Sequence, residues 1–438
     1  MRRRFPRWLY PGMHLKRWMV LLFAGIVILG LGAAIFVRDL YRDTAPNFDW
    51  IFVVTGAWMP PELRAAVFAS IGLVLTAVGA WGLFRSVLAP FVERGDSVLE
   101  VLYTKRYLAR GPRIVAIGGG TGLSTLLRGL KGYSANITAI VAVADDGGSS
   151  GQLRQQLGII PPGDIRNCIA ALADAEPLMT QLMQYRFPAG SGLDNHAFGN
   201  LFIAAMTAVT GDFEEAVRES NRVLAVRGQV LPATSVPLNL VATLASGRHA
   251  RGQVSVASAD EPIERIEIEP SDVRATPEAL ERILEADLIV IGPGSLFTSV
   301  LPNLLIGDIR DAVRTSNALR VYVCNVATQP GETPDFTAAE HLAALLDHVG
   351  PGVIDYMLVN YNDGARRPAG WPARPVPLDS RRLDEFPVVI VEEDLVDLGN
   401  AHHHDPAKLA AALVRLQQED RGERPRRSRV RRFATRAS

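Results

Sequence analysis

The sequence has few cysteines and no excess of charge of either sign. Its 438 residues include only two cysteines, Cys168 and Cys324, and the formal net charge is +0. Two widely separated cysteines exclude a disulfide scaffold and a cysteine-rich zinc site, and they are typical of small core residues in a reducing compartment. Balanced charge gives no indication of a polyanionic partner, so we expect no nucleic acid to bind.

Several signatures of catalytic chemistry are also absent. The sequence contains no Ser-His-Asp, Cys-His or HExxH arrangement, and no internal repeat is evident. Residues 402–405 read His-His-His-Asp, but three consecutive histidines on one segment point in different directions. We therefore expect no metal site there.

Long apolar runs, in contrast, are present near the N-terminus. Apolar residues make up 48% of the chain, a share high enough to indicate membrane segments. Residues 18–37 and 65–84 each contain no charged side chain, and each is long enough to cross a bilayer of ~30 Å. Because neither run holds an acid or a base, we expect a membrane anchor rather than a transport pathway.

The charges that flank these runs predict the topology. The segment before the first run carries Arg2, Arg3, Arg4, Arg7, Lys16 and Arg17, whereas the loop between the runs has three arginines offset by four acids. This asymmetry places the N-terminus in the cytoplasm, and two spans return the chain to the same side. A cleaved signal peptide is disfavoured, since no small-residue cleavage site is evident and a second run follows. The prediction is a multi-pass protein of the inner or plasma membrane with its main domain in the cytoplasm.

Composition divides the chain into four parts. Residues 1–87 form the predicted anchor, and residues 88–112 form a linker with a short amphipathic helix near 98–108. Residues 113–418 form the main domain. Residues 419–438 are arginine-rich with few apolar side chains, so we expect a disordered tail, which could also touch anionic lipid.

The main domain alternates short apolar strands with helical segments. The predicted strands are 113–117, 137–144, 287–292, 320–326 and 354–360. Residues 236–256 alternate in polarity on both sides of Ser246-Gly247, which indicates a β-hairpin. Near-continuous apolar strands separated by helices predict an α/β, Rossmann-like fold: a mostly parallel sheet with helices on both faces and an inserted β-hairpin, preceded by two transmembrane helices.

The first predicted strand ends in a glycine-rich loop. In an open α/β sheet, ligands bind outside the carboxyl ends of the strands. Glycine lets the backbone approach a ligand closely, and a helix N-terminus behind it offers N–H donors to an anion. The loop is neither a GxGxxG fingerprint nor a P-loop, because Leu123 stands where the last glycine would be and no Gly-Lys-Ser/Thr follows. We expect a phosphate near Gly119, Gly120, Thr121 and Gly122.

The second strand ends in two adjacent acids. Asp145 lies 23 positions after Gly122, near the spacing at which an acid contacts ribose hydroxyls, and Asp146 and Ser149 follow it. Either acid could instead hold a magnesium ion that bridges phosphates. The alternative for Asp145 is that it caps its own turn.

Other loops add polar candidates. The loops 292–299 and 325–333 follow buried strands, and amide and hydroxyl groups of this kind orient sugars and bases. In the segment PPGDIRN, Asp164 can cap a helix, and Arg166 either reaches a phosphate or lies on the surface as a solvated side chain. The histidine of the segment DNHAFGN has the alternative of a purely structural role. The further candidate ligand-binding residues are Arg166, Asn167, His196, Asn200, Gly292, Gly294, Ser295 and Asn325.

Together these segments resemble one family. The segments GGGTGLSTLLRGLK, VAVADDGGSSGQLR, PPGDIRN, HAFGNL, GDFEEAVRESNRVLAVRGQVLPAT, ADLIVIGPGSLFTSVLPNLL and VYVCNVATQPGET are similar to those of the YvcK-type proteins, or gluconeogenesis factors, a branch of the CofD-like superfamily. The resemblance covers about residues 113–415. It implies a Rossmann-like core, binding of a UDP-sugar such as UDP-N-acetylglucosamine, and regulation of carbon and cell-envelope metabolism and of cell shape in bacteria.

The other branch of that superfamily, 2-phospho-L-lactate transferase, moves a phospholactyl group from a guanylyl donor onto a deazaflavin alcohol with magnesium. By resemblance, residues 119–122 contact the nucleotide, and Asp145 and Asp146 match an acidic loop that is a metal or substrate site in the transferases. His196 and Asn200 match a His-x-x-Gly-Asn motif, and Gly292, Gly294 and Ser295 match a second glycine loop. The chain departs from the family pattern at Asp194-Asn195, Ala197 and His403.

The sequence therefore predicts a membrane-anchored, cytoplasm-facing regulator that binds a nucleotide sugar and could form homo-oligomers. The alternative is a magnesium-dependent transferase, in which Asp145 and Asp146 hold the metal on a diphosphate. The acid pair serves both readings, so the sequence leaves open whether the protein is an enzyme. An NAD-dependent oxidoreductase is disfavoured by the interrupted fingerprint.

Overall fold

The structure is a computed structural model that describes residues 15–40, 60–88, 107–173, 176–365 and 373–427. It divides into two compact units, Met1–Lys105 and Arg106–Ser438. Most of the amphipathic helix expected near 98–108 lies outside the described residues, as does the end of the tail from residue 428.

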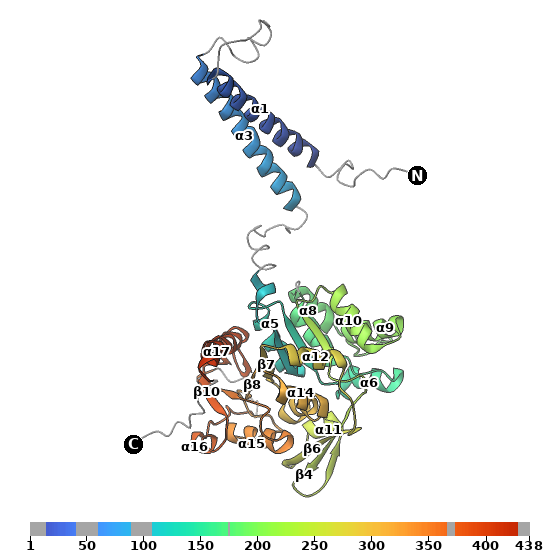
Figure 1. Cartoon of the computed structure of the whole chain (residues 1–438). Coiled ribbons are helices and arrows are strands. Elements are labelled where there is room, and N and C mark those ends of the chain that lie inside the picture. The colour runs from blue at the N-terminus through green and yellow to red at the C-terminus, as the bar shows by residue number, and fades with distance from the viewer. Residues whose placement is uncertain (1–14, 41–59, 89–106, 174–175, 366–372, 428–438) are drawn as a thin grey trace, which may run out of the picture. The chain divides into compact units, whose positions relative to one another are not determined.

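The first unit consists of two helices that pack against each other, α1 (Leu15–Leu40) and α3 (Pro61–Leu88) (Figure 1). Small residues let the backbones meet: a Cβ at Gly72 would lie 2.7 Å from the backbone nitrogen of Leu29. Both apolar runs are therefore helical, as predicted. In α3, Ala66–Ser86 is long and apolar enough to cross a membrane, whereas the apolar part of α1, Trp18–Ala34, is shorter. Two membrane-spanning helices are thus not established, since among the described residues one helix meets the length and composition of a span.

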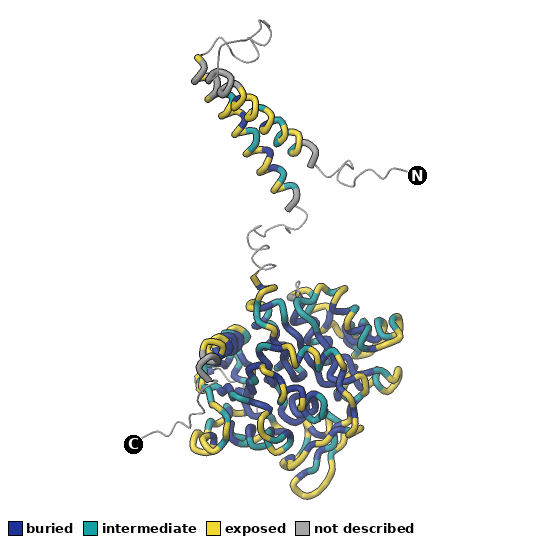
Figure 2. The backbone as a smooth tube through the Cα atoms, in the orientation of Figure 1, coloured by how far each residue is buried: buried dark blue, intermediate teal, exposed yellow. Residues whose placement is uncertain are grey.

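The second unit is built on a seven-stranded sheet in which every pairing is parallel. The central strands are buried along their whole length, because both faces are covered (Figure 2). From one edge to the other the strands are β10 (Val389–Glu393), β9 (Tyr356–Asn360), β8 (Leu319–Val323), β7 (Leu288–Ile291), β1 (Ile114–Gly118), β2 (Ile137–Val141) and β3 (Gln229–Pro232). The predicted α/β class is confirmed.

The strand order reverses between β1 and β7. From β1 the chain adds β2 and then β3 on one side, returns to the middle with β7, and adds β8, β9 and β10 on the other side. This is the order of a Rossmann-type sheet, extended by one strand. Ligands of such sheets bind in the crevice at the carboxyl ends of the two strands where the order reverses.

Helices flank the sheet on both faces (Figure 1). On one face α5 (Gly120–Leu130) packs against both α7 (Gly163–Leu172) and α17 (Pro406–Arg427). Other helices around the sheet include α12 (Pro277–Glu285), α13 (Leu301–Leu304), α14 (Gly307–Thr315) and α15 (Ala338–Val349). Where disorder was predicted from residue 419, α17 continues to Arg427. The reason is that this helix buries Leu413, Leu416 and Asp420.

The predicted hairpin is present and gains a third strand. β4 (Asn239–Leu244) pairs antiparallel with β5 (His249–Arg251) and with β6 (Ile263–Glu269). Alternate residues of β4 are buried, as its alternating polarity requires. The remaining elements are η3 (Leu108–Arg110), α6 (Gly148–Leu157), α8 (Glu176–Gln184), α9 (Phe198–Thr210), α10 (Phe213–Val223), α11 (Gln253–Ala257), a π-helix η4 (Leu296–Val300), α16 (Ser380–Leu383), β11 (Val396–Asp397) and β12 (Asn400–His404).

Candidate ligand-binding site

A cavity of about 860 Å³ lies at the carboxyl ends of β1 and β7, where the strand order reverses. The predicted residues that line it are Gly119, Gly120, Thr121, Gly122, Asn167, Gly294, Ser295 and Asn325. The predicted residues outside the lining are Asp145, Asp146, Ser149, Arg166, His196, Asn200 and Gly292. The fold therefore joins the two glycine loops and the amide-rich loop around one cavity, and it places the acid pair and the His-Asn motif elsewhere.

The two glycine loops touch through their backbones. A Cβ at Gly122 would lie 2.5 Å from the carbonyl oxygen of Pro293, so only glycine fits this contact. Gly120 has a φ of +65°, in the left-handed region that other residues rarely adopt. The N-terminus of α5 begins directly after Gly119, with no acidic residue in its own first turn. Bare backbone and a helix N-terminus together suit an anion such as a phosphate.

Asp164 is a half-buried carboxyl in the lining of this cavity that the sequence pointed to only as a helix cap. It lies in the first turn of α7, and Pro162 takes the N-cap position. Burial and the neighbouring Asp145 raise the pKa of Asp164 from 3.8 to about 7, although the Gly120 N–H and Arg166 favour its charged form. A carboxyl with such a pKa at a ligand cavity can give or accept a proton near neutral pH. No local pattern in the sequence reveals this, because the burial comes from α5 and α7 meeting.

A chain of amide hydrogen bonds forms the opposite wall. Asn325 Nδ2 donates to Gln329 Oε1 (3.2 Å), and Gln329 Nε2 donates to Ser295 Oγ (2.9 Å). The backbone nitrogen of Gly294 donates to Asn325 Oδ1 (3.3 Å). The amide-rich loop is thereby fixed against the second glycine loop, with polar groups facing the cavity.

Glu332 is a second buried acid that the sequence analysis missed. Its carboxylate accepts hydrogen bonds from Phe297 N (3.2 Å), Thr298 N (3.3 Å) and Thr298 Oγ1 (2.7 Å). Burial raises the pKa of Glu332, and these hydrogen bonds oppose that rise. Glu332 therefore anchors the start of η4 below the second glycine loop. The sequence signal that could have identified Glu332 is that it is the one acid in a loop otherwise rich in amide and hydroxyl side chains.

The acid pair of the second strand is bonded to backbone. Asp145 Oδ1 accepts from the N–H of Gly147 (3.0 Å), the turn-capping alternative considered above. Asp146 Oδ1 accepts from the N–H of Val254 (3.0 Å) in α11. Across the parts of the chain that the structure describes, no group of three or more His, Cys, Asp or Glu side chains is arranged to hold a metal. Magnesium binding by Asp145 and Asp146 stays a prediction.

Ser149, His196 and Asn200 form a buried polar cluster between α6 and α9. Ser149 Oγ lies 3.1 Å from His196 Nδ1 and accepts from Asn200 Nδ2 (3.1 Å) and from Ala197 N (3.2 Å). Arg166, also buried, donates to Asn167 Oδ1 (3.0 Å). These contacts position α6, α9 and the start of α7. Asn167 lines the cavity, whereas the other residues of these contacts lie outside its lining.

The histidine segment, in contrast, does reach the cavity. The lining includes Asn400, His402, His403 and His404 of β12. His404 is buried with Nε2 3.1 Å from the carbonyl oxygen of Cys324, and burial lowers the pKa of His404 to about 4. His404 is thus neutral at pH 7 and supports the wall.

Comparison with known proteins gives one consistent family. The family model for 2-phospho-L-lactate transferase CofD matches residues 114–396. A putative gluconeogenesis factor of Nostoc sp. is 47% identical over 427 residues, which cover 93% of this chain and 92% of that protein. The gluconeogenesis factor of Bacillus subtilis is 48% identical over 317 residues, 71% of this chain and 100% of that protein. The chain belongs to the gluconeogenesis factor family, which is CofD-like.

A solved structure and the lengths of the relatives agree with this family. The crystal structure of a UPF0052-family protein from Bacillus halodurans is 45% identical, with a TM-score of 0.66 over 70% of this chain and 99% of that one. The Nostoc alignment extends into the N-terminal unit of this chain, whereas the B. subtilis protein is fully matched by 71% of it. Gluconeogenesis factors therefore occur both with and without a segment corresponding to part of the N-terminal unit.

Proposed function

We propose that this gluconeogenesis factor binds a nucleotide sugar of the UDP-N-acetylglucosamine type and regulates carbon and cell-envelope metabolism and cell shape. The observation that supports this most is the cavity at the carboxyl ends of β1 and β7, lined by both glycine loops and the amide-rich loop. Its volume of about 860 Å³ falls within the range of small-molecule and cofactor sites.

The lining offers a group for each part of such a ligand. The backbone of residues 119–122 and the N-terminus of α5 suit the diphosphate. Amides and hydroxyls of Asn325, Thr328 and Gln329 can hydrogen-bond to a base or a sugar. Binding of this kind needs positioning and no bond cleavage, in keeping with relatives that are named factors.

We also propose that α1 and α3 anchor the protein in the inner or plasma membrane with the main domain in the cytoplasm. The support is the apolar stretch Ala66–Ser86, the exposed apolar side chains of Phe23, Leu73 and Trp81, and the basic segment before α1. A reporter fused after Ser438 is expected on the cytoplasmic side, and a signal from the outer side would overturn this topology.

The second candidate function is a magnesium-dependent transferase. The family model is that of 2-phospho-L-lactate transferase, and Asp145 lies close enough to Asp164 to raise the pKa of that cavity carboxyl. A divalent cation would neutralise charge on a diphosphate. Of the acid pair, Asp145 fits this role better, since Asp146 is bonded to α11.

One titration separates the two functions. The full-length protein in detergent is titrated with UDP-N-acetylglucosamine by calorimetry, with and without magnesium. Saturable binding that needs no magnesium and consumes no ligand is the expected result. Absence of UDP-sugar binding, together with magnesium-dependent transfer from a guanylyl donor, would replace the regulator by the transferase.

A further inference from the structure

A second, smaller cavity lies at the opposite edge of the sheet. Its volume is about 340 Å³, and it is formed by the first residues of β1, β2 and β3 together with α12. Because all strands run parallel, this amino-terminal edge faces away from the candidate nucleotide-sugar site. The polar side chains that line it are Arg113, Asn136, Thr138, Gln229, Arg282 and Glu285.

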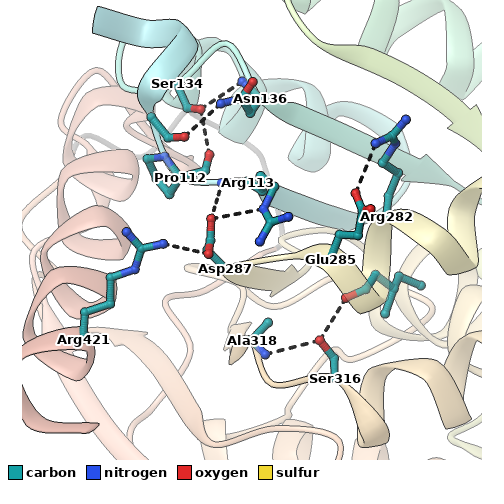
Figure 3. Close-up of polar contacts among 12 residues, drawn as sticks. Pro112, Arg113, Ser134, Asn136, Arg282, Glu285, Asp287, Ser316, Ala318 and Arg421 are labelled. Atoms are coloured by element: carbon teal, nitrogen blue, oxygen red, sulfur yellow. Dashed lines mark hydrogen bonds and ion pairs between the residues drawn. The ribbon is translucent and has the colours of Figure 1, made fainter. Parts of the chain in front are cut away.

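Arg113 is bonded through its backbone nitrogen and Nε, which leaves its two terminal guanidinium nitrogens available to a ligand. Its backbone nitrogen donates to Asp287 Oδ2 (2.8 Å), and its Nε lies 3.5 Å from the same oxygen (Figure 3). Arg421 of α17 pairs with the other oxygen of Asp287 at 2.7 Å. Over residues 107–173, 176–365 and 373–427, the two terminal guanidinium nitrogens of Arg113 have no further hydrogen bond or ion pair. Asp287 therefore orients a guanidinium group without occupying its outer donors.

A second guanidinium group is fixed in the wall by α12. Arg282 pairs with Glu285 at 3.3 Å (Figure 3). It also pairs with Glu278 at 3.7 Å. In the orientation that satisfies both amide atoms, the Gln229 oxygen accepts from Arg282 Nε at 2.9 Å. These contacts hold Arg282 in place and leave Thr138 and Gln229 beside it as neutral hydrogen-bonding groups.

The floor between these walls is bare backbone. Gly228 has a φ of +96°, and a Cβ there would lie 2.3 Å from the carbonyl oxygen of Ile137. A side chain at this position would collide with the start of β2. Because Gly228 has no side chain, β3 can begin close to β2, and the space of the cavity stays open at this point.

We propose that this cavity binds the oxyanion of a small metabolite, a phosphate or a carboxylate, through Arg113 with Arg282 as the second cation. The planar guanidinium fork matches such groups in a bidentate way. The lining holds two guanidinium groups and one carboxylate, Glu285, which is paired with Arg282. Two carboxylates outside the lining also pair with these arginines, Glu278 with Arg282 and Asp287 with Arg113, and Asp287 is shared with Arg421. At less than half the volume of the first cavity, it suits a compact ligand rather than a nucleotide sugar. This site would give the domain an effector position separate from its nucleotide-sugar cavity, and it does not depend on that proposed function.

The test uses the full-length protein in detergent and three probes: inorganic phosphate, glycerol 3-phosphate and citrate. Calorimetry is expected to show saturable binding of at least one of them, and the preferred probe separates a phosphate from a carboxylate ligand. Arg113→Gln is expected to weaken that binding at least tenfold. Arg222→Gln is the matched control, because Arg222 is 81% exposed on α10 and lies outside the cavity lining.

A second variant is needed because Arg113→Gln also removes the contact with Asp287 and could weaken binding by disturbing the fold. Gln229→Glu adds a negative charge to the opposite wall and should also weaken binding at least tenfold, with an unchanged far-UV circular dichroism spectrum. Binding should persist when UDP-N-acetylglucosamine is in excess. Absence of binding for all three probes, equal weakening by Arg222→Gln, or displacement by the nucleotide sugar would each overturn the proposal.

Discussion

The Oδ2 atom of Asp164 lies 2.6 Å from the position that a Cβ at Gly119 would occupy. A half-buried carboxyl of α7 is therefore packed against the bare backbone where α5 begins. Because an anion would bind at the same helix N-terminus, the protonation of Asp164 and the charge of the ligand are expected to influence each other. The first prediction concerns this carboxyl.

Asp164→Asn is expected to stabilise the protein at alkaline pH. The pKa of Asp164 is about 7 in the folded protein and 3.8 in the reference state, so between these values the folded state holds a proton that the unfolded state has released. Wild-type stability therefore falls as pH rises through this window, by up to about 4 kcal/mol. Asparagine stays neutral and removes this slope.

Chemical unfolding of wild type and Asp164→Asn, followed by circular dichroism from pH 4 to pH 8, checks this. The two proteins should differ little at pH 4, and the variant should be the more stable one at pH 8. An equal difference at every pH would show that the pKa of Asp164 is the same in the folded and unfolded states.

Gly122→Ala is expected to disrupt the contact between the glycine loops. The added Cβ would lie 2.5 Å from the carbonyl oxygen of Pro293, a backbone atom that cannot move cheaply. We expect a loss of about 1–3 kcal/mol of unfolding free energy and at least tenfold weaker nucleotide-sugar binding. Gly132→Ala is the control, since its Cβ would meet only the carbonyl oxygen of Gly129 at 3.5 Å. Equal calorimetric affinities for both variants would contradict the placement of the ligand at this loop.

Glu332→Gln is expected to loosen the second glycine loop. The N–H groups of Phe297 and Thr298 both donate to Oε2, and the Thr298 hydroxyl donates to Oε1. A glutamine that keeps its oxygen at the Oε2 position retains both N–H bonds without the carboxylate charge, and its NH2 group faces Thr298 Oγ1, which must then accept. Hydrogen bonds to charged groups contribute about 1.5–3 kcal/mol and neutral ones about 0.5–1.5 kcal/mol, so we expect a loss of about 1 kcal/mol. Thermal unfolding should reveal this loss, while Glu267→Gln should change little, because the Glu267 side chain on β6 is exposed. A variant as stable as wild type would mean that the carboxylate charge is not needed there.

Asp146→Ala is expected to act through structure. Its carboxylate caps the N-terminus of α11 by accepting from Val254 N, and such a cap contributes about 1 kcal/mol. Stability should fall by that amount, and the affinity for nucleotide sugar should fall equally with and without magnesium, because Gln253 of α11 lines the cavity. Unchanged stability combined with a loss of magnesium-dependent binding would instead assign Asp146 to a metal site.

Within the seven-stranded sheet, the strands that sequence analysis identified are the five interior ones. β1, β2 and β7 are continuous apolar runs, and burial on both sides of a parallel sheet requires that pattern. The missed strands, β3 and β10, are the two edges of the sheet. β3 has four residues and ends in Pro232, and β10 is partly exposed throughout, so neither carries the same apolar signal.

The start of the predicted tail, residues 419–427, is helical rather than disordered, and residues 428–438 lie outside the described residues. α17 packs on α5 through an apolar face that includes Leu413 and Leu416, which precede the tail, and the helix continues past residue 418 with Asp420 buried. Arg421 then reaches Asp287. The average composition of a segment does not show whether its few apolar side chains share one face of a helix, whereas packing depends on that face alone.

The sequence by itself determined the fold class, the family and the glycine loops, because apolar runs and glycine positions are local properties that the chain carries wherever it folds. Tertiary structure alone decided which loops share a cavity. The order of the strands brings residues 119–122 and 292–295 together and adds Asp164 and the histidines of β12. It directs Asp146 to α11 and Ser149 to His196, away from the cavity. Contacts between distant loops follow from strand order and helix packing, and no spacing along the chain encodes them.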